Sequence, residues 1–117
     1  MSDTLASDKE FVEFIVDQIV NVGTITYRKM FGEYAIYCNG KIVALVSDNQ
    51  LFVKPTESGR AYIENVIEAP PYPGAKPYFL IEAQFEDSEW ISNLIRLTAK
   101  ELPEPKPQKK PPKVEKQ

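Results

Sequence analysis

Two polar dipeptides, Asn39-Gly40 and Asp48-Asn49, divide the most apolar part of this chain into short segments. The segments YAIYC, KIVALV and LFVK beside them are rich in β-branched and aromatic residues, which favour strands. An Asn-Gly pair readily adopts the two positive φ angles of a type I′ turn, which joins adjacent antiparallel strands. Together with the preceding TITYRKMF, these segments predict an antiparallel meander of about four strands from Thr24 to Lys54.

Helical periodicity flanks the meander on both sides. The segment SDKEFVEFIVDQIVNVG has apolar residues at helical spacing, with Ser7 and Glu10 in capping-box positions and Gly23 as a stop signal. A short helix is predicted in TESGRAYIENVI, although Gly59 weakens that pattern, and a final helix from about Asp87 to Leu102. The residues expected to pack are Phe11, Phe14, Ile15, Ile19 and Val22 in the first helix, Ala61, Tyr62, Ile63, Val66 and Ile67 in the second, and Trp90, Ile91, Leu94, Ile95, Leu97 and Thr98 in the third.

A fifth strand is predicted in YFLIEA, after the stiff, proline-rich stretch APPYPGAKP. The element order is therefore α-β-β-β-β-α-β-α, an α+β fold with a single antiparallel sheet of about five strands and flanking helices. The 117 residues, 43% of them hydrophobic, suffice for one compact domain. We assign residues 1–102 to this domain. Residues 103–117 form a Pro/Lys-rich basic tail that is too poor in apolar residues to fold and is predicted to be disordered.

Charge is divided unequally between these two parts. Residues 1–103 carry nine Lys or Arg against fifteen Asp or Glu, a net charge of −6, whereas five lysines and two glutamates follow Pro103. An acidic surface repels phosphate, so weak nucleic-acid binding is expected only from the tail, and a purely solubilising tail is the alternative. The candidate phosphate contacts are Lys106, Lys109, Lys110, Lys113 and Lys116.

The chain contains no histidine, which excludes Ser-His-Asp and Cys-His nucleophile systems and most zinc sites. Cys38 is the single cysteine and cannot form an intramolecular disulfide, as expected in a reducing compartment. Lys41 could lower the pKa of this thiol across the turn, but a small residue at a strand end is the ordinary explanation. No apolar run approaches the ~20 residues of a membrane span, and the N-terminal residues lack a signal-peptide pattern. A cytoplasmic protein without cofactor, metal or membrane association is predicted.

The stretch MFGEYAIYCNGKIVALVSDNQLFVK resembles the N-terminal domain of the TfoX family, also called Sxy, whose bacterial members regulate natural competence. The resemblance covers about residues 8–102 and includes Tyr72-Pro73 and Trp90, while Glu33 stands where many members have a second glycine. It implies a secretion-chaperone-like fold and a noncatalytic regulatory or adaptor module that binds a protein partner, in a transcriptional complex for the full-length regulators. Those regulators continue into a second helical domain, whereas this chain continues into the Pro/Lys tail. The motif positions, mainly structural, are Met30, Phe31, Gly32, Tyr34, Asn39, Gly40, Lys41, Leu51 and Lys54.

Two alternatives to the adaptor hypothesis remain open at the level of sequence. The first is a small-molecule-binding domain or an enzyme of unknown substrate, with a sheet-and-loop pocket near Met30, Tyr72 and Tyr78. The second is a self-associating domain, because a sheet with a free edge can pair with its own copy to form a homodimer.

The tail hypothesis makes a quantitative prediction. Ending the chain after Leu102 removes five lysines but almost no apolar surface, so the free energy of unfolding should change little. If four or five tail lysines contact phosphate, log affinity should fall against log salt with a slope of roughly −3 to −5, and truncation should lower the affinity sharply and abolish that salt dependence. Fluorescence anisotropy with duplex and single-stranded probes at several salt concentrations measures both effects. Equal binding by the truncated protein would contradict the hypothesis.

Overall fold

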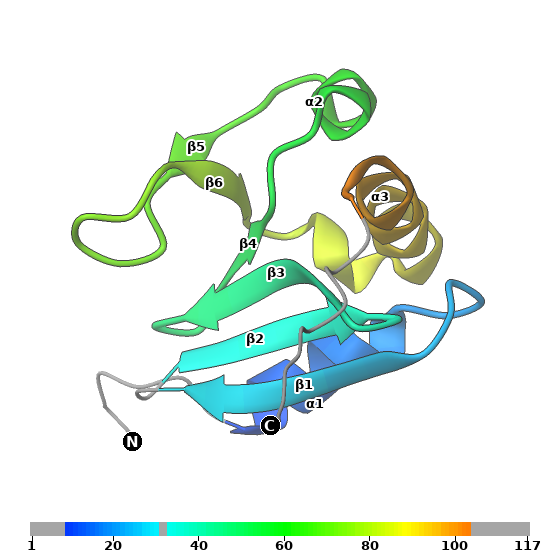
Figure 1. Ribbon diagram of the computed structural model, residues 1–117, viewed down its shortest axis with the longest axis horizontal. Coiled ribbons are helices and arrows are strands. Elements are labelled where there is room, and N and C mark those ends of the chain that lie inside the picture. The colour runs from blue at the N-terminus through cyan, green and yellow to red at the C-terminus, as the bar shows by residue number, and fades with distance from the viewer. Residues whose placement is uncertain (1–8, 31–32, 104–117) are drawn as a thin grey trace, which may run out of the picture.

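The computed structural model describes residues 9–30 and 33–103. In it, helices pack against one antiparallel sheet whose strands differ in length (Figure 1). The predicted α+β class, with one antiparallel sheet and flanking helices, is confirmed. The elements in chain order are α1 (Lys9–Gln18), β1 (Ile25–Met30), β2 (Glu33–Cys38), β3 (Lys41–Ser47), β4 (Gln50–Val53), α2 (Glu57–Ile63), β5 (Glu68–Ala69), β6 (Tyr78–Ile81), the 3-10 turn η1 (Gln84–Glu86) and α3 (Ser88–Glu101).

The six strands lie in the order β1-β2-β3-β4-β6-β5, with every neighbouring pair antiparallel. The predicted four-strand meander is therefore present, and β6 is the predicted strand in YFLIEA. The strand β5, which the sequence pattern did not predict, has two residues and pairs with the outer side of β6. A strand of this length has too few residues to show an alternating pattern, so the sheet has six strands where about five were expected.

Both predicted turns have the backbone geometry that joins antiparallel strands tightly. Asn39 and Gly40 have φ angles of 51° and 86°, and Asp48 and Asn49 have φ angles of 55° and 56°. Two consecutive positive φ angles are the mark of a type I′ turn. These turns set the registers that place Tyr37 opposite Ile42 and Ser47 opposite Gln50.

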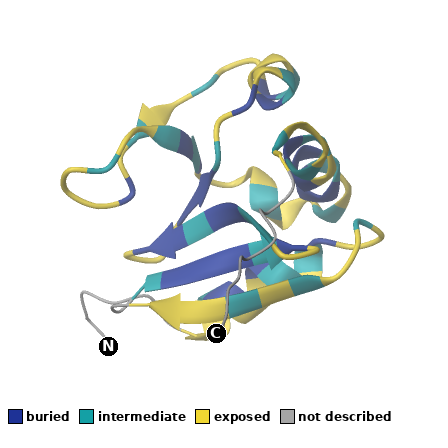
Figure 2. Ribbon diagram, in the orientation of Figure 1, coloured by how far each residue is buried: buried dark blue, intermediate teal, exposed yellow. Residues whose placement is uncertain are grey.

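The core lies between the helices and one face of the sheet. Alternate residues of β2, Tyr34, Ile36 and Cys38, point into this core, and Figure 2 shows that β2 and β3 are largely buried while β1 is exposed. From α1 and α3 the core receives Val12, Ile15, Ile91, Leu94 and Ile95, which are fully buried. We call the other side of the sheet the open face, because α1 and α3 do not cover it.

The two long helices meet through a polar network as well as through the core. The Ser92 hydroxyl donates a hydrogen bond to the Gln18 carbonyl (3.1 Å) and accepts one from the Val20 amide (2.8 Å). The Gln18 side chain in turn donates to the carbonyls of Phe85 and Glu86. These bonds satisfy groups at the end of α1, which stops at Gln18 rather than continuing to Gly23 as predicted.

Several residues predicted to pack in the core lie at its margin. Phe14 is 44% exposed and contacts only the edge of the Phe85 ring, while Val12, which the prediction omitted, is buried.

Trp90 of α3 is half-buried and packs on Tyr62 of α2, with ring centroids 5.4 Å apart, and the Tyr62 hydroxyl donates to the Trp90 carbonyl. In α2 and the segment after it, Ala61 and Ile67 are exposed. Large rings at the edge of a helix's apolar face therefore cover the core rather than fill it.

The predicted short helix is confirmed as α2, and Gly59, which weakened the sequence pattern, lies in its first turn for a packing reason. The Thr56 hydroxyl caps the helix by accepting from the Gly59 amide (2.9 Å), and Gly59 is buried. A Cβ atom at this position would lie 2.7 Å from the Thr56 Oγ1 and 3.3 Å from the Phe79 ring. The close approach of α2 to the sheet therefore requires a residue without a side chain.

The first turn of α2 is also held by the end of α3. The Glu101 carboxylate accepts hydrogen bonds from the amides of Glu57 and Ser58, both 3.0 Å, and from the Ser58 hydroxyl at 2.8 Å. These bonds favour the charged form and lower the pKa of Glu101. Within the described residues, none of the helices is long and apolar enough to cross a bilayer.

The bonds of Glu101 predict a defined pH dependence. Because its pKa is lowered on folding, the contribution of Glu101 is fully present above the pKa of the unfolded chain and is lost as pH falls through the lower folded value. Glu101→Gln should therefore be less stable than the wild type at pH 7, and the difference should shrink on acidification below about pH 4. Urea unfolding at several pH values measures it. Glu82→Gln, which alters an exposed carboxylate, is the control, and a difference independent of pH would contradict the assignment.

Candidate functional site

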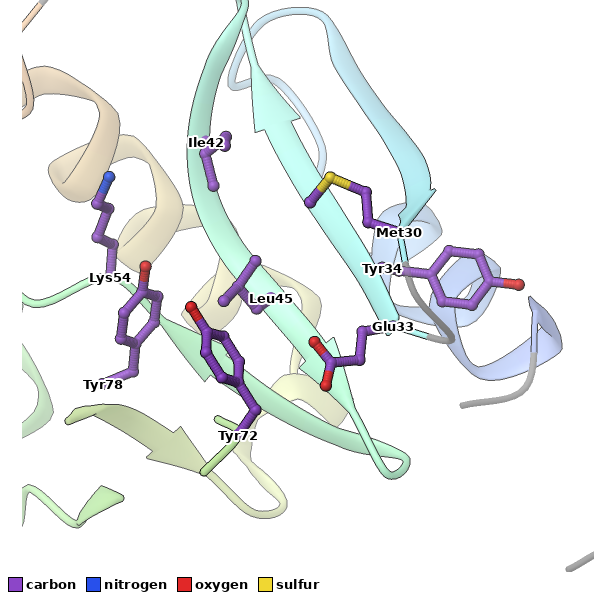
Figure 3. A pocket seen from close by; sticks show the side chains of 8 residues that line it. All are labelled: Met30, Glu33, Tyr34, Ile42, Leu45, Lys54, Tyr72 and Tyr78. Carbon is purple, nitrogen blue, oxygen red and sulfur yellow. The ribbon is translucent and has the colours of Figure 1, made fainter. Parts of the chain in front are cut away.

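The open face of the sheet contains a groove of about 530 Å³. Its floor is formed by Ile42 and Leu45 of β3, and Met30 at the end of β1 lies along one side (Figure 3). Tyr72 and Tyr78 form the opposite side, with Lys54 next to them. The pocket that the sequence placed near Met30, Tyr72 and Tyr78 therefore corresponds to a real depression in the structure.

The two tyrosines are positioned by the connection between β5 and β6. Its residues Tyr72-Pro73-Gly74-Ala75 form a turn in which the Ala75 amide donates to the Tyr72 carbonyl (3.0 Å) and Gly74 has a φ angle of 88°. Proline followed by a residue with positive φ is the pattern of a type II turn. Tyr78 is the first residue of β6, and burial, followed by the nearby Tyr72 hydroxyl, raises its pKa. The Tyr78 hydroxyl therefore stays protonated at neutral pH and can donate a hydrogen bond.

Two charged side chains line the groove at different places. Lys54 follows β4, where its backbone amide donates to the Val43 carbonyl (2.9 Å), and its ammonium group has no hydrogen bond or ion pair among residues 9–30 and 33–103. Glu33 begins β2 on the side of Met30, and its carboxylate accepts from the Ser47 hydroxyl (3.2 Å). The acid of the groove is therefore partnered and the cation is not.

The other motif positions that the structure describes on the strands belong to the core. Tyr34 borders the groove through its backbone position, but its ring points away from it and packs edge-on against Tyr27, with centroids 5.8 Å apart. Leu51 is fully buried on the helix side of β4. Phe31 and Gly32, the remainder of the Met30 motif, lie outside the described residues.

The motif Asn39-Gly40-Lys41 connects the sheet to distant segments. The Asn39 side chain accepts from the Thr24 amide (2.9 Å), and its own backbone amide donates to the Thr24 carbonyl (2.9 Å). The Lys41 ammonium donates to the carbonyls of Ala99 and Leu102, at 2.7 and 3.0 Å. These two carbonyls lie at the C-terminal end of α3, where a cation is favoured by the helix dipole. The observed contacts of this motif are therefore structural.

Cys38 ends β2 and is fully buried. Burial raises the pKa of its thiol, and the nearby Lys41 ammonium offsets only part of this effect. The thiol lies 3.7 Å from the Val22 carbonyl, and it is not part of the groove. Such a thiol is inert, since reactive cysteines need exposure and a lowered pKa. The described part of the chain also contains no group of three carboxylate or thiol side chains placed to hold a metal ion.

Some groove residues could be found from sequence and others could not. The sequence patterns predicted Ile42 and Leu45 only as strand residues, and they singled out Glu33 only as a departure from the family motif. Strict alternation along β3 would place Ile42 and Leu45, three residues apart, on opposite faces, and only the register shift between β2 and β3 near Ile36 lets both line the groove. The five tail lysines, Lys106, Lys109, Lys110, Lys113 and Lys116, lie outside the described residues.

The sequence matches the model of a known protein family. The model of the TfoX N-terminal domain matches residues 17–102, which is most of the chain. The chain belongs to this family. The match begins near the end of α1 and ends at the C-terminal end of α3, so it covers the whole sheet, α2 and α3, and it contains all the described residues that line the groove.

Two relatives show how far the similarity extends. An uncharacterized 12.7 kDa protein in the trpE 5′ region of Spirochaeta aurantia is 40% identical over 105 residues, which is 90% of this chain and 91% of the relative. Protein Sxy of Escherichia coli (strain K12) is 33% identical over 46 residues, which is 39% of this chain but 22% of Sxy. The chain is therefore a TfoX N-terminal domain related to Sxy over a limited segment.

The environment of Cys38 predicts low reactivity. In the folded protein, 5,5′-dithiobis(2-nitrobenzoate) should modify Cys38 on the order of 100-fold more slowly than in urea, because the reaction must wait for the strand to open. Absorbance of the released thiolate measures the rate. Rates within a few fold of each other at neutral pH would show that the thiol is accessible and would reopen a chemical role for Cys38.

Proposed function

We propose that this TfoX N-terminal domain is a noncatalytic regulatory or adaptor module that binds a protein partner on the open face of its sheet. The observation that carries the proposal is the unequal covering of the two faces. Helices fill one face, whereas the other holds a groove whose exposed apolar residues include Met30, 38% exposed, and Tyr72, 46% exposed. Contiguous exposed apolar surface of this kind is typical of interaction sites.

Charge favours a protein partner over nucleic acid for the folded body. Residues 1–103 carry a net charge of −6, which repels a phosphate backbone at long range. Any nucleic-acid affinity would then come from the tail lysines. The body would supply specificity through apolar contacts, and the tail would add weak electrostatic attraction.

Family membership supports a regulatory role. The domain is related to competence regulators, and we extend this relation to participation in a transcriptional complex. Because the aligned segment spans 22% of Sxy, the activity of the whole of Sxy is part of this proposal rather than a consequence of the alignment. A binding role also suits a domain whose lone cysteine is buried.

A second candidate function, small-molecule binding, is favoured by one specific observation. The Lys54 ammonium and the hydroxyls of Tyr72 and Tyr78 border the same groove, and none of them has a hydrogen-bond partner in the part of the chain that the structure describes. A ligand with a matching acceptor would satisfy these groups. Such binding would not require a protein partner.

The adaptor proposal predicts that partner binding depends on the open face. Ile42→Arg places a charge on the groove floor and should reduce capture of specific partners at least tenfold, because an unpaired charge would have to be buried in the complex. The full chain carrying an affinity tag would be expressed in its native cells, and co-purified proteins would be quantified by mass spectrometry.

Val20→Arg is the matched control for this experiment. Val20 is β-branched like Ile42 and 45% exposed, whereas Ile42 is half-buried, and Val20 follows α1 and does not line the groove. Circular dichroism melts would establish that both variants fold. Equal capture by the wild type and Ile42→Arg, or loss of capture in both variants, would remove the open face as the binding surface.

A further inference from the structure

We propose that the groove on the open face is a binding site for a small monocarboxylic acid with an apolar body, such as a fatty or aryl acid. This inference goes beyond the adaptor function and needs no protein partner. It rests on three features of the described residues that line the groove: a cation and two phenols without hydrogen-bond partners among residues 9–30 and 33–103, an apolar floor, and one acid, Glu33, that is already hydrogen-bonded.

The first feature identifies the charged group of the ligand. Figure 3 shows Lys54, Tyr78 and Tyr72 side by side along one side of the groove, with their polar ends directed the same way. The ammonium and the two hydroxyls have no hydrogen-bond partners among the described residues. A carboxylate has two oxygens that accept hydrogen bonds from several such donors, and a bond from an ammonium is charge-assisted. A tyrosine hydroxyl is protonated at neutral pH, as this role requires, and burial raises the pKa of Tyr78 further.

The second feature identifies the rest of the ligand. Ile42 and Leu45 form an apolar floor, and Met30 lies beside it with a flexible thioether side chain that adapts to different shapes. The volume of about 530 Å³ lies within the usual range of ligand pockets, roughly 300–1,000 Å³. An alkyl chain or an aromatic ring placed on this floor would remove from water both its own apolar surface and that of the groove.

The third feature limits the ligand to one carboxylate and disfavours an extended peptide main chain lying in the groove, although side chains of a protein partner could still contact the open face. Glu33 lies on the side of Met30, hydrogen-bonded to Ser47, and would repel a second carboxylate there.

A peptide main chain would bring N–H and C=O groups onto Ile42 and Leu45, whose side chains cannot form hydrogen bonds with them, and each unpaired group costs free energy. An alkyl or aryl acid has no polar groups besides its carboxylate, so it meets the groove without that cost.

Isothermal titration calorimetry of the purified full chain tests the assignment with two acids, decanoate and 3-phenylpropionate. At least one should bind, and the matching neutral alcohol, 1-decanol or 3-phenylpropanol, should bind at least tenfold more weakly. This comparison uses only the wild type and does not depend on the folding of any variant. Failure of both acids to bind, or equal affinity for an acid and its alcohol, would overturn the proposal.

Variants locate the site within the molecule. Lys54→Met keeps an unbranched side chain but removes the charge, and it should weaken binding of the acid at least tenfold while leaving that of the alcohol unchanged. Tyr78→Phe should weaken binding of the acid several-fold. Lys100→Met, on the exposed side of α3 and outside the groove, is the matched control and should bind like the wild type. Undiminished affinity in folded Lys54→Met would place the acid elsewhere and overturn the assignment.

The outcome is separable from that of the adaptor proposal. Ligand binding is measured with purified protein alone, whereas the adaptor function is measured by partner capture. If acids bind and no partner is captured, the domain is a ligand-binding module. If partners are captured and no acid binds, the groove is only part of a protein-binding surface and the assignment of a carboxylate site is wrong.

Discussion

The packing of α3 against one face of the sheet is the contact on which the rest of the domain depends. Ile91, Leu94 and Ile95 are fully buried there, and each buried aliphatic side chain of this size contributes on the order of 2 kcal/mol to folding. The same helix also contacts α1, β3 and α2 through polar groups. Its first turns hold the end of α1 through Ser92, and its C-terminal end is capped by Lys41 and holds α2 through Glu101. Removing α3 would therefore expose the core and release both other helices at once.

Because α1 and α3 lie on the same side, the sheet is left with two faces of different character. The helix side is closed, and its residues are constrained by packing. The open face is not covered by these helices, and there Lys54 and the two tyrosines have no hydrogen-bond partners among the described residues. An unpartnered ammonium beside apolar side chains contributes little to stability. The uncovered face is the basis of the adaptor proposal, and the hydrogen-bond donors along its groove are the basis of the acid-binding proposal.

The two proposals also have a joint consequence. A partner on the open face and an acid in the groove would both contact Ile42 and Leu45, so each would alter the affinity for the other by the same factor. A bound acid would fill the depression and cancel the charge of Lys54, thereby changing both the shape and the electrostatics that the partner meets. A regulatory domain with this arrangement would respond to the concentration of a metabolite without any catalytic step.

The sequence by itself determined the meander and its turns, because these depend on neighbouring residues. Positive φ angles at Asn39-Gly40 and Asp48-Asn49 follow from local preference, and Thr56 and Asp87 begin their helices through bonds within one turn. Composition alone likewise limited the chemistry, because a chain without histidine lacks the usual base of nucleophilic catalysis.

Only the tertiary structure decided which apolar residues are core and which form the groove. Phe14 and Trp90 have the right spacing for burial, but the neighbouring elements cover only one side of each helix, and both rings remain at the margin. The groove combines Met30, Lys54 and Tyr78 from three strand ends with Tyr72 from a loop, so no single segment contains its pattern. Strand pairing brings these residues together across long sequence separations, and the energy of such contacts depends on the whole sheet rather than on local preference.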